Sequence, residues 1–513
     1  MEEIKKLAQV HKILDFHVKK NPDNVSLSID SISYTNSEVL SKVLSLVGLL
    51  KRNKVTSGDR IAFLAKNSSE FIELMYASSI LELVMVPINF RLAYEEVKFI
   101  IQDSGSKIII FGEEFKELVE KLNADKTDLH LSFGISELRN LLKSKSPGAF
   151  DVSLSVNKDT KTPLFQMYTS GTTGNPKGAL ISQKGIMSLI TNGMNNLGPF
   201  DPNAVNLVCM PLFHIAGSAW LFFGLASGCK NILLVDINPE KILDIIENYN
   251  VATTLMVPAV IQMVVVAAEK NSKVLKNVKN IVFGASPMAV DTLKRAQKIF
   301  PNSNFTHVYG MTETTGMFMS LDPSELKANR RLESCGKCFS NSEIKIVDAH
   351  NNEVPTNTIG EIICRTDQIM DGYFNREKAN NEAIKDGWFY TGDAGYLDEE
   401  GYLFIRDRIK DLIITGGENV YPAEVENALM LQPSIIDCAV IGVSDPKWGE
   451  AVIALVIVNS DNFSEIEVRS SLRSQLAGFK IPKTFHVVDS LPRNAGGKIT
   501  KHVLREKYAY LGK

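Results

Sequence analysis

Residues 163–178 read PLFQMYTSGTTGNPKG, a short apolar run followed by a turn rich in glycine, serine and threonine. The apolar run is typical of a buried strand. Glycines in the turn let successive backbone N–H groups point the same way, and such a nest attracts phosphate oxygens. The hydroxyl groups add hydrogen-bond donors, and Lys177 adds a positive charge. The stretch therefore predicts a strand that ends in an anion-binding turn.

This turn is not the common nucleotide-binding loop. That loop requires a glycine, four residues and then Gly-Lys followed by Ser or Thr, whereas Lys177 is followed by Gly178 and Ala179. A surface linker is the alternative interpretation, because clusters of Gly, Ser, Thr, Asn and Pro usually form loops. If the turn binds phosphate, its candidate contacts are Thr169, Ser170, Gly171, Thr172, Thr173, Gly174 and Lys177.

Strands and helices alternate on the N-terminal side of the turn. Apolar runs at 60–65, 84–88 and 107–111 predict strands, and the sequence between them predicts helices at about 69–81 and 94–102. The strands carry apolar residues on both faces. This pattern favours a parallel sheet covered by helices on both sides, so we assign the chain to the α/β class.

On the C-terminal side of the turn, further strands end in turns. The segments 254–258, 280–286 and 307–316 each read as a strand that ends in a turn. Several such turns at the C-terminal ends of strands form the expected ligand crevice of an α/β sheet.

The character of the sequence changes near residue 342, where β signals and tight turns become frequent. We therefore expect a large N-terminal domain, residues 1–409, of parallel or mixed sheets covered by helices, with a small β-subdomain at about 342–409. Residues 410–513 are again mixed, and we expect them to form a separate small α+β domain.

Composition limits the classes of function. The chain has 513 residues with 44% hydrophobic and 22% charged, which is ordinary for a soluble globular protein, and a formal net charge of −3. That charge supplies no basic field for nucleic acid. Six scattered cysteines and an N-terminal segment without the apolar centre of a signal peptide lead us to expect a cytoplasmic protein. Cys335 and Cys338 form a CxxC pair without a second pair, so we expect ordinary thiols rather than a metal site.

Two uncharged stretches, 202–229 and 251–268, are long enough to cross a bilayer. Pro211 and His214 interrupt the first, and Pro258 interrupts the second. Because proline breaks a helix interior, we interpret each stretch as a strand that leads into a buried helix and predict no transmembrane span.

The glycine-rich turn closely resembles the phosphate loop of the adenylate-forming enzymes, which include acyl-CoA synthetases, adenylation domains of peptide synthetases and luciferases. Four further motifs of that family follow in its order and extend to Lys501. They are YGMTE at 309–313, YTGDAGYLDEEGYLFIRDR at 390–408, ITGGENVYPAEVE at 414–426 and PRNAGGKITK at 492–501. The resemblance implies ATP and Mg²⁺ as cofactors and an acyl-adenylate intermediate.

By this resemblance, Thr312 contacts the α-phosphate, Glu313 holds Mg²⁺ and Tyr309 stacks near adenine. Magnesium takes one or two carboxylates and completes its shell with phosphate oxygens and water, which agrees with a single glutamate. The alternative is an ordinary exposed turn. The resemblance also assigns to the nucleotide Gly284, Ala285, Ser286, Gly310, Met311 and Ile405.

The later motifs carry further roles. The resemblance implies that Asp393 accepts hydrogen bonds from the ribose hydroxyls and that Arg408 reaches the ribose; a salt-bridged β-hairpin is the alternative. It makes Lys410 the hinge about which the C-terminal domain moves. The coenzyme A arm would pass Gly416, Gly417 and Glu418, because glycines let a ligand approach the backbone closely.

Lys498 lies in a glycine-rich turn near the C-terminus. The resemblance makes it the lysine that bridges the substrate carboxylate and the α-phosphate while the adenylate forms, since a placed cation stabilises the charge on the phosphoryl oxygens. The alternative is one more solvated lysine, which is the usual state of lysines.

The acid substrate is indicated by residues 213–216, Phe-His-Ile-Ala. Domains that activate α-amino acids carry an aspartate after this phenylalanine, whereas here His214 would leave an ammonium group unpaired. We therefore expect a plain carboxylic acid, in a pocket of residues that suit a fatty or aryl acid. His214 is by resemblance a gate near the acyl-adenylate, with a hydrogen-bonded core histidine as the alternative. The expected pocket residues are His214, Met256, Val260, Gly284, Met311 and Met317.

The sequence thus predicts an ATP-dependent acyl-CoA synthetase with coenzyme A as co-substrate, acting on a small-molecule carboxylic acid, with a medium- or long-chain fatty acid as the first choice. Three alternatives stay open. They are an aryl acid–CoA ligase similar to 4-coumarate–CoA ligase, a stand-alone acyl-AMP ligase that loads a carrier protein, and a catalytically silent nucleotide-binding scaffold. A homodimer is also left open.

Overall fold

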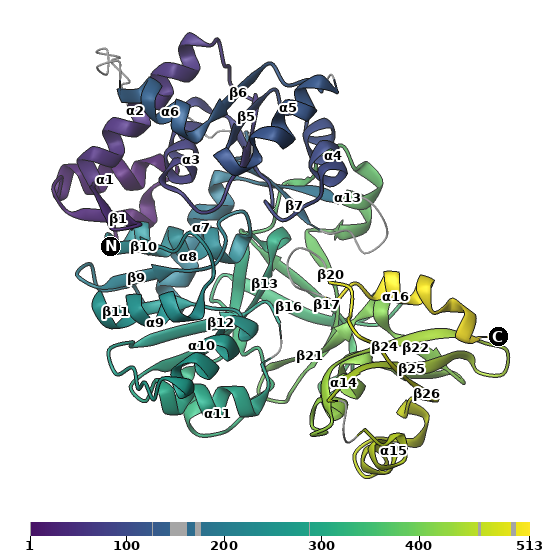
Figure 1. Ribbon diagram of the computed structural model, residues 1–513. Coiled ribbons are helices and arrows are strands. Elements are labelled where there is room, and N and C mark those ends of the chain that lie inside the picture. The colour runs from purple at the N-terminus through teal and green to yellow at the C-terminus, as the bar shows by residue number, and fades with distance from the viewer. Residues whose placement is uncertain are drawn as a thin grey trace. The chain divides into compact units, whose positions relative to one another are not determined.

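The computed structural model describes residues 2–125, 127–143, 162–169, 176–286, 288–459, 463–493 and 499–512. The chain divides into two compact units. Within the described residues, the first unit comprises 2–125, 127–143, 162–169, 176–286, 288–343 and 365–387, and the second comprises 344–364, 388–459, 463–493 and 499–512. Figure 1 labels many of the helices and strands of both.

The first unit contains a seven-stranded sheet in the order β18-β8-β7-β4-β3-β5-β6. Strands β3 to β7 run parallel, and β8 and β18 are added antiparallel at one edge. The bounds are β3 (Arg60–Leu64), β4 (Val84–Pro87), β5 (Ile108–Phe111), β6 (Leu131–Gly134), β7 (Phe165–Thr169), β8 (Lys177–Ile181) and β18 (Gly372–Tyr373). The parallel sheet predicted from the apolar runs is therefore confirmed.

Helices pack on this sheet with their apolar residues. Val97 and Ile101 of α4 and Val119 of α5 share one buried cluster with Val86 and Ile109 of the strands. Helix α3 is buried around almost its whole circumference, which explains its nearly uniform apolar sequence. The helices near this sheet are α2 (Asn36–Arg52), α3 (Ser69–Leu81), α4 (Tyr94–Ser104), α5 (Lys116–Ala124), α6 (Ile135–Lys143) and α13 (Glu377–Ala383).

A nine-stranded sheet in the order β15-β14-β13-β12-β11-β9-β10-β1-β2 completes the first unit. Its central strands are parallel and its edges antiparallel. The bounds are β1 (Val25–Ile29), β2 (Ile32–Thr35), β9 (Val205–Val208), β10 (Lys230–Leu233), β11 (Val251–Leu255), β12 (Asn280–Gly284), β13 (Asn304–Met311), β14 (Gly316–Ser320) and β15 (Lys337–Cys338). The remaining helices are α1 (His11–Lys20), α7 (Gln183–Asn196), α8 (Ile215–Ser227), α9 (Pro239–Asn248), α10 (Pro258–Lys270), α11 (Val290–Ile299) and α12 (Pro323–Lys327).

The two uncharged stretches fold as predicted, each as a strand that leads into a helix: β9 precedes α8, and β11 precedes α10. The second strand is 251–255 rather than the expected 254–258, because Pro258 starts α10, where its fixed φ suits the first helical turn. No helix in the part of the chain that the structure describes is long and apolar enough to cross a membrane.

The second unit begins with a small sheet in which β17, β20 and β21 run antiparallel, next to β16. The bounds are β16 (Ser342–Val347), β17 (Gly360–Thr366), β20 (Trp388–Leu397) and β21 (Leu403–Arg408). The region 342–409, expected as a β-subdomain, is interrupted, because residues 365–387 belong to the first unit, where β18 pairs with β8.

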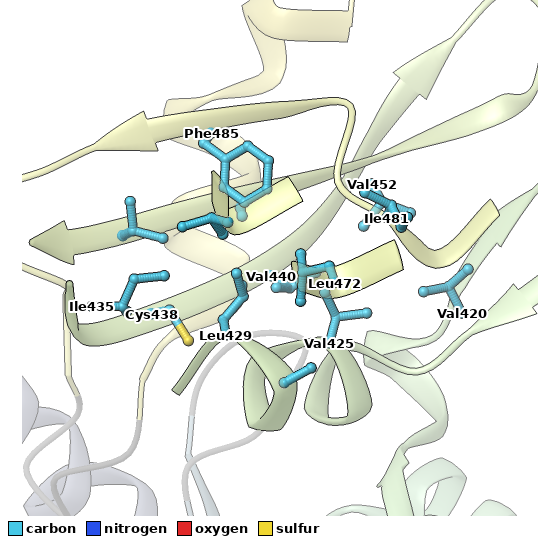
Figure 2. Packing of buried hydrophobic residues seen from close by; sticks show 14 of the residues in the cluster. Val420, Val425, Leu429, Ile435, Cys438, Val440, Val452, Leu472, Ile481 and Phe485 are labelled. Carbon is cyan, nitrogen blue, oxygen red and sulfur yellow. The ribbon is translucent and has the colours of Figure 1, made fainter. Parts of the chain in front are cut away.

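A five-stranded sheet and three helices form the C-terminal part of the second unit. Leu429 of α14 and Leu472 of α15 pack with Val440 of β24 in one buried cluster, which Figure 2 shows. The bounds are β22 (Ile413–Thr415), β23 (Glu418–Val420), β24 (Ile435–Asp445), β25 (Gly449–Val458), β26 (Thr484–Val487), α14 (Pro422–Met430), α15 (Glu465–Arg473) and α16 (Lys501–Lys507). The α/β class is confirmed, whereas the boundary at 410 stays a prediction.

Candidate active site

The strands on either side of the glycine-rich turn are well defined. β7 and β8 pair antiparallel, so Thr169 lies opposite Lys177 and Tyr168 lies opposite Gly178. The turn therefore starts and ends at neighbouring points on one sheet. Its residues Ser170, Gly171, Thr172, Thr173 and Gly174 lie outside the described residues, and so does Lys498. Their predicted contacts with phosphate stay predictions.

The YGMTE motif forms the end of β13 and a tight turn. A short 3₁₀ helix, Thr312–Thr314, follows the strand, and β14 returns beside it. The Thr314 hydroxyl accepts a hydrogen bond from the Met311 N–H at 3.0 Å and donates to the Gly316 carbonyl at 2.8 Å. A Cβ on Gly310 would lie 2.0 Å from that carbonyl oxygen, so only glycine fits there. This turn leaves Thr312 and Glu313 half-buried rather than in the core.

A tyrosine from the edge of the other sheet contacts the Glu313 carboxylate. The Tyr373 hydroxyl, on β18, donates a hydrogen bond to Oε1 of Glu313 at 2.9 Å. The ammonium nitrogen of Lys177 lies 4.9 Å from the centre of the Tyr373 ring. The structure thus brings Glu313 and Lys177, two predicted site residues from distant motifs, to the same tyrosine.

The surroundings of Glu313 fit a magnesium ion shared with phosphate. The described residues include no group of three or more His, Cys, Asp or Glu side chains able to hold a metal by themselves. Magnesium does not need such a cage, because it binds through one or two carboxylates together with phosphate oxygens and water. The Tyr373 hydroxyl is hydrogen-bonded to Oε1 of Glu313, and the other carboxylate oxygen, Oε2, has no hydrogen-bond partner among the described residues.

The end of β12 lies beside the end of β13, since Gly284 pairs with Val308. A Cβ on Gly284 would lie 2.3 Å from the Val308 carbonyl oxygen, which explains the glycine. Ala285, with φ of 67°, and Ser286 then turn outward and are exposed. Two predicted nucleotide segments, 284–286 and 309–313, therefore meet at the C-terminal edge of one sheet, as expected for the ligand crevice of an α/β fold.

The expected acyl-pocket residues differ in exposure. Met256, Val260 and Met317 are buried, whereas His214 and Met311 are partly exposed. His214 caps the N-terminus of α8, and its Nδ1 accepts the Ala216 N–H at 3.2 Å. It is therefore hydrogen-bonded, as in the alternative interpretation, but it is not a fully buried core residue. The acyl pocket stays a prediction.

In the second unit, Asp393 and Arg408 lie opposite each other on β20 and β21. The Arg408 Nε atom is 2.7 Å from Oδ1 of Asp393, and the carboxylate is almost buried. This is the salt-bridged hairpin that was the alternative to ribose binding. Ile405 lies on the same strand and pairs with Gly395. Ribose binding by Asp393 and Arg408 stays a prediction.

An ionic cluster surrounds the predicted hinge. Lys410 is exposed in a short 3₁₀ helix, Ile409–Asp411, and Asp411 pairs with Arg505 at 2.5 Å. Lys501 lies 2.9 Å from Glu426, and these side chains are 12% and 19% exposed. Burial raises the pKa of Glu426 and of Asp407, although Lys501 opposes this. Burial acts to lower the pKa of Lys501, but the two carboxylates outweigh it and raise that pKa.

The predicted coenzyme A segment is the tip of the β22–β23 hairpin. Gly416 and Gly417 have φ values of 60° and 85°, as two-residue hairpin turns require. The Gly416 N–H donates to the Trp448 carbonyl at 2.7 Å, and a Cβ there would lie 2.8 Å from the indole ring. Glu418 follows on the surface. The binding of coenzyme A here stays a prediction.

Sequence reasoning missed Tyr373. Sixty residues separate it from Glu313, and no periodicity connects the two. The only local signal is its place after Gly372, whose φ of 126° requires glycine.

Comparison with known proteins identifies the family. The model of the AMP-binding enzyme family matches residues 14–374, and the model of the AMP-binding enzyme C-terminal domain matches residues 424–498. The first range contains the phosphate-loop motif and the YGMTE motif, and the second contains residues 492–498 of the last motif and the end of the fourth. The motif at 390–408 lies between the two matched ranges.

Relatives match over nearly the whole length. The chain is 31% identical to the fatty acid–[acyl-carrier-protein] ligase ScoC of Streptomyces coeruleorubidus, over 96% of this chain and 95% of that protein. It is 33% identical to the long-chain-fatty-acid–CoA ligase FadD13 of Mycobacterium tuberculosis, over 91% and 90%.

A solved relative is similar in fold. O-succinylbenzoate coenzyme A synthetase (MenE) from Bacillus subtilis, in complex with ATP and a magnesium ion, superposes with a TM-score of 0.85 at 29% identity, over 96% of this chain and 98% of that one. The same enzyme is also known with its acyl-adenylate intermediate. With two family models matched and this fold shared, the chain belongs to the AMP-binding enzyme family, among the adenylate-forming acid–thiol ligases.

Proposed function

We propose that this enzyme activates a carboxylic acid with ATP and transfers the acyl group to coenzyme A. A carboxylate oxygen of the acid attacks the α-phosphorus, the bond to the bridging oxygen breaks, and pyrophosphate leaves. The thiol sulfur then attacks the carbonyl carbon of the acyl-adenylate, and AMP leaves. The observation that supports this best is the meeting of Glu313 and Lys177 at Tyr373, beside the strands that flank the phosphate loop.

In this proposal Glu313 holds Mg²⁺, which would neutralise charge on the phosphates when bound. Thr312 contacts the α-phosphate, Asp393 and Arg408 hold the ribose, and Lys498 stabilises the charge that develops during adenylation. The Asp393–Arg408 ion pair supports the ribose role in one respect, since the arginine fixes the carboxylate whose oxygens would accept the diol hydrogens.

For the acid, we propose a medium- or long-chain fatty acid. The name of FadD13 gives a long-chain fatty acid and that of ScoC a fatty acid, and both support the choice. The absence of a carboxylate at His214 favours a plain carboxylic acid over an α-amino acid. An aryl acid is the second candidate, because MenE acts on o-succinylbenzoate by its name.

A panel of fatty and aryl acids, scored by pyrophosphate release and AMP formation, tests the acid. We expect turnover with fatty acids of medium or long chain and slower turnover with aryl acids. A chain that releases no pyrophosphate with any acid would be the nucleotide-binding scaffold. Thioester yield with free coenzyme A and with a holo-carrier protein, in parallel, identifies the acceptor; preference for the carrier would replace coenzyme A in the proposal.

Replacing Lys498 tests whether this lysine serves the adenylation half-reaction alone or both half-reactions. In Lys498→Ala we expect adenylation to fall by roughly 10²–10³-fold, the loss typical of one electrostatic donor to a developing charge. Conversion of supplied acyl-AMP to the thioester should stay near the wild-type rate. Equal loss of both half-reactions would contradict a lysine that serves adenylation alone.

A further inference from the structure

The segment 371–374 extends the sheet at the strand that leaves the phosphate loop. The Asp371 N–H donates to the Leu180 carbonyl at 2.9 Å, and the Phe374 N–H donates to the Gly178 carbonyl at 2.8 Å. Between them, β18 pairs with β8. The segment is therefore fixed to β8 within a few residues of Lys177.

The backbone of Tyr373 is held on its other side as well. Its N–H donates to Oδ1 of Asn380 at 2.6 Å, and Nδ2 of Asn380 donates to the Tyr373 carbonyl at 3.0 Å. Asn380 belongs to α13, whose residues follow directly in sequence. Both edges of the strand are therefore occupied, which fixes the backbone from which the tyrosine side chain extends, and the side chain is buried.

The residues after Tyr373 are joined to the strand that enters the phosphate loop. The Arg60 guanidinium stacks 4.0 Å above the Phe374 ring, and Arg376 pairs with Asp103. Asp103 also accepts a hydrogen bond from the Tyr168 hydroxyl at 2.8 Å. The segment 371–376 thus contacts residues on both strands of the loop, directly at β8 and through Asp103 at β7.

We propose that Tyr373 is a positioning residue that orients the Glu313 carboxylate and the Lys177 ammonium group for the same magnesium nucleotide. Its hydroxyl donates to Oε1 of Glu313, which would leave Oε2 to bind a metal. The negative face of its ring attracts the Lys177 ammonium group. This inference rests on the proposed function, because it assumes that Glu313 binds the metal.

Tyr373→Phe separates the hydroxyl from the ring. We expect it to weaken the binding of ATP in the presence of Mg²⁺ by about 10-fold, as for other residues that orient a metal ligand. Binding of ATP in EDTA should not change, because the ring still attracts Lys177. Titration calorimetry with Mg·ATP and with metal-free ATP measures both. Tyr373→Leu, which also removes the ring, should weaken binding in both conditions.

The matched control is Tyr94→Phe. Tyr94 donates a hydrogen bond to Asp125 at 2.6 Å on the exposed surface of the first unit, so the variant loses one tyrosine–carboxylate bond of the same kind. We expect its binding of ATP to equal that of the wild type in both conditions. Thermal unfolding of all variants checks that they are folded.

A second measurement distinguishes positioning from general stability. If Tyr373 acts through Glu313, then adding Tyr373→Phe to Glu313→Gln should produce no further loss of Mg·ATP affinity. An equal loss in both backgrounds, or a Tyr373→Phe variant with unchanged Mg·ATP affinity, would overturn the inference. Should the wild type itself bind no Mg·ATP, the proposed function would fail instead, and Mn²⁺ binding followed by electron paramagnetic resonance would confirm that result.

Discussion

Glu313 in the first unit and Glu426 in the second are both glutamates whose carboxylates have a defined partner, yet their surroundings differ. Glu313 is half-buried and accepts a hydrogen bond from a neutral hydroxyl. Glu426 is paired directly with Lys501, accepts the Val440 N–H at 2.7 Å, and lies where burial raises its pKa. The protein supplies Glu426 with a cation, whereas among the described residues Glu313 has a neutral hydroxyl as its donor. A carboxylate with a neutral partner at the end of a strand is therefore the better candidate for a metal.

Removing the charge at Glu313 should give the largest effect. In Glu313→Gln we expect adenylation to fall roughly 10³-fold, because a metal at phosphoryl oxygens supplies several kcal/mol of transition-state stabilisation. The free energy of unfolding should change little, since the amide can still accept from Tyr373. Pyrophosphate release and urea unfolding measure the two quantities. A large loss of stability with little loss of activity would mean that Glu313 stabilises the fold, as we expect of Glu426, and does not bind the metal.

Lys501→Met should have the opposite effect from Glu313→Gln, with a large loss of stability and little loss of activity. Removal of one partner of a nearly buried ion pair leaves Glu426 and Asp407 without their shared cation, and we expect a loss of about 3 kcal/mol, the low end for such pairs. Urea unfolding measures this loss. The control is Lys378→Met, whose lysine is 92% exposed and lies 4.0 Å from Glu382, so its loss should cost at most a few tenths of a kcal/mol. Equal costs for both variants would show that the cluster contributes no more than a surface pair.

The sequence predicted Glu313 as a site residue, but it predicted neither its partner Tyr373 nor the ionic cluster around Lys501. The parallel strands of the α/β sheet were predicted from apolar runs such as 107–111, and Glu313 was found from the YGMTE motif. Both signals are local. Tyr373 could not be predicted, because its contact with Glu313 depends on β18 joining the edge of a sheet formed almost 200 residues earlier. The Lys501 cluster was missed for the same reason: its partners lie on β21 and α14, and no spacing reveals a buried pair.

The pH dependence of stability offers the finest test of the comparison. Because the folded chain raises the pKa of Glu426 above its unfolded value near 4.5, the folded state binds more protons there, and this favourable contribution is lost as pH rises through the folded pKa. Glu426→Gln removes this titration. We therefore expect the stability of the wild type relative to the variant to fall as the pH rises above 4.5, by about 1.4 kcal/mol for each pKa unit between the two states. Urea unfolding at several pH values measures the difference. A difference that does not vary with pH would mean that Lys501 fully offsets the effect of burial on the pKa of Glu426.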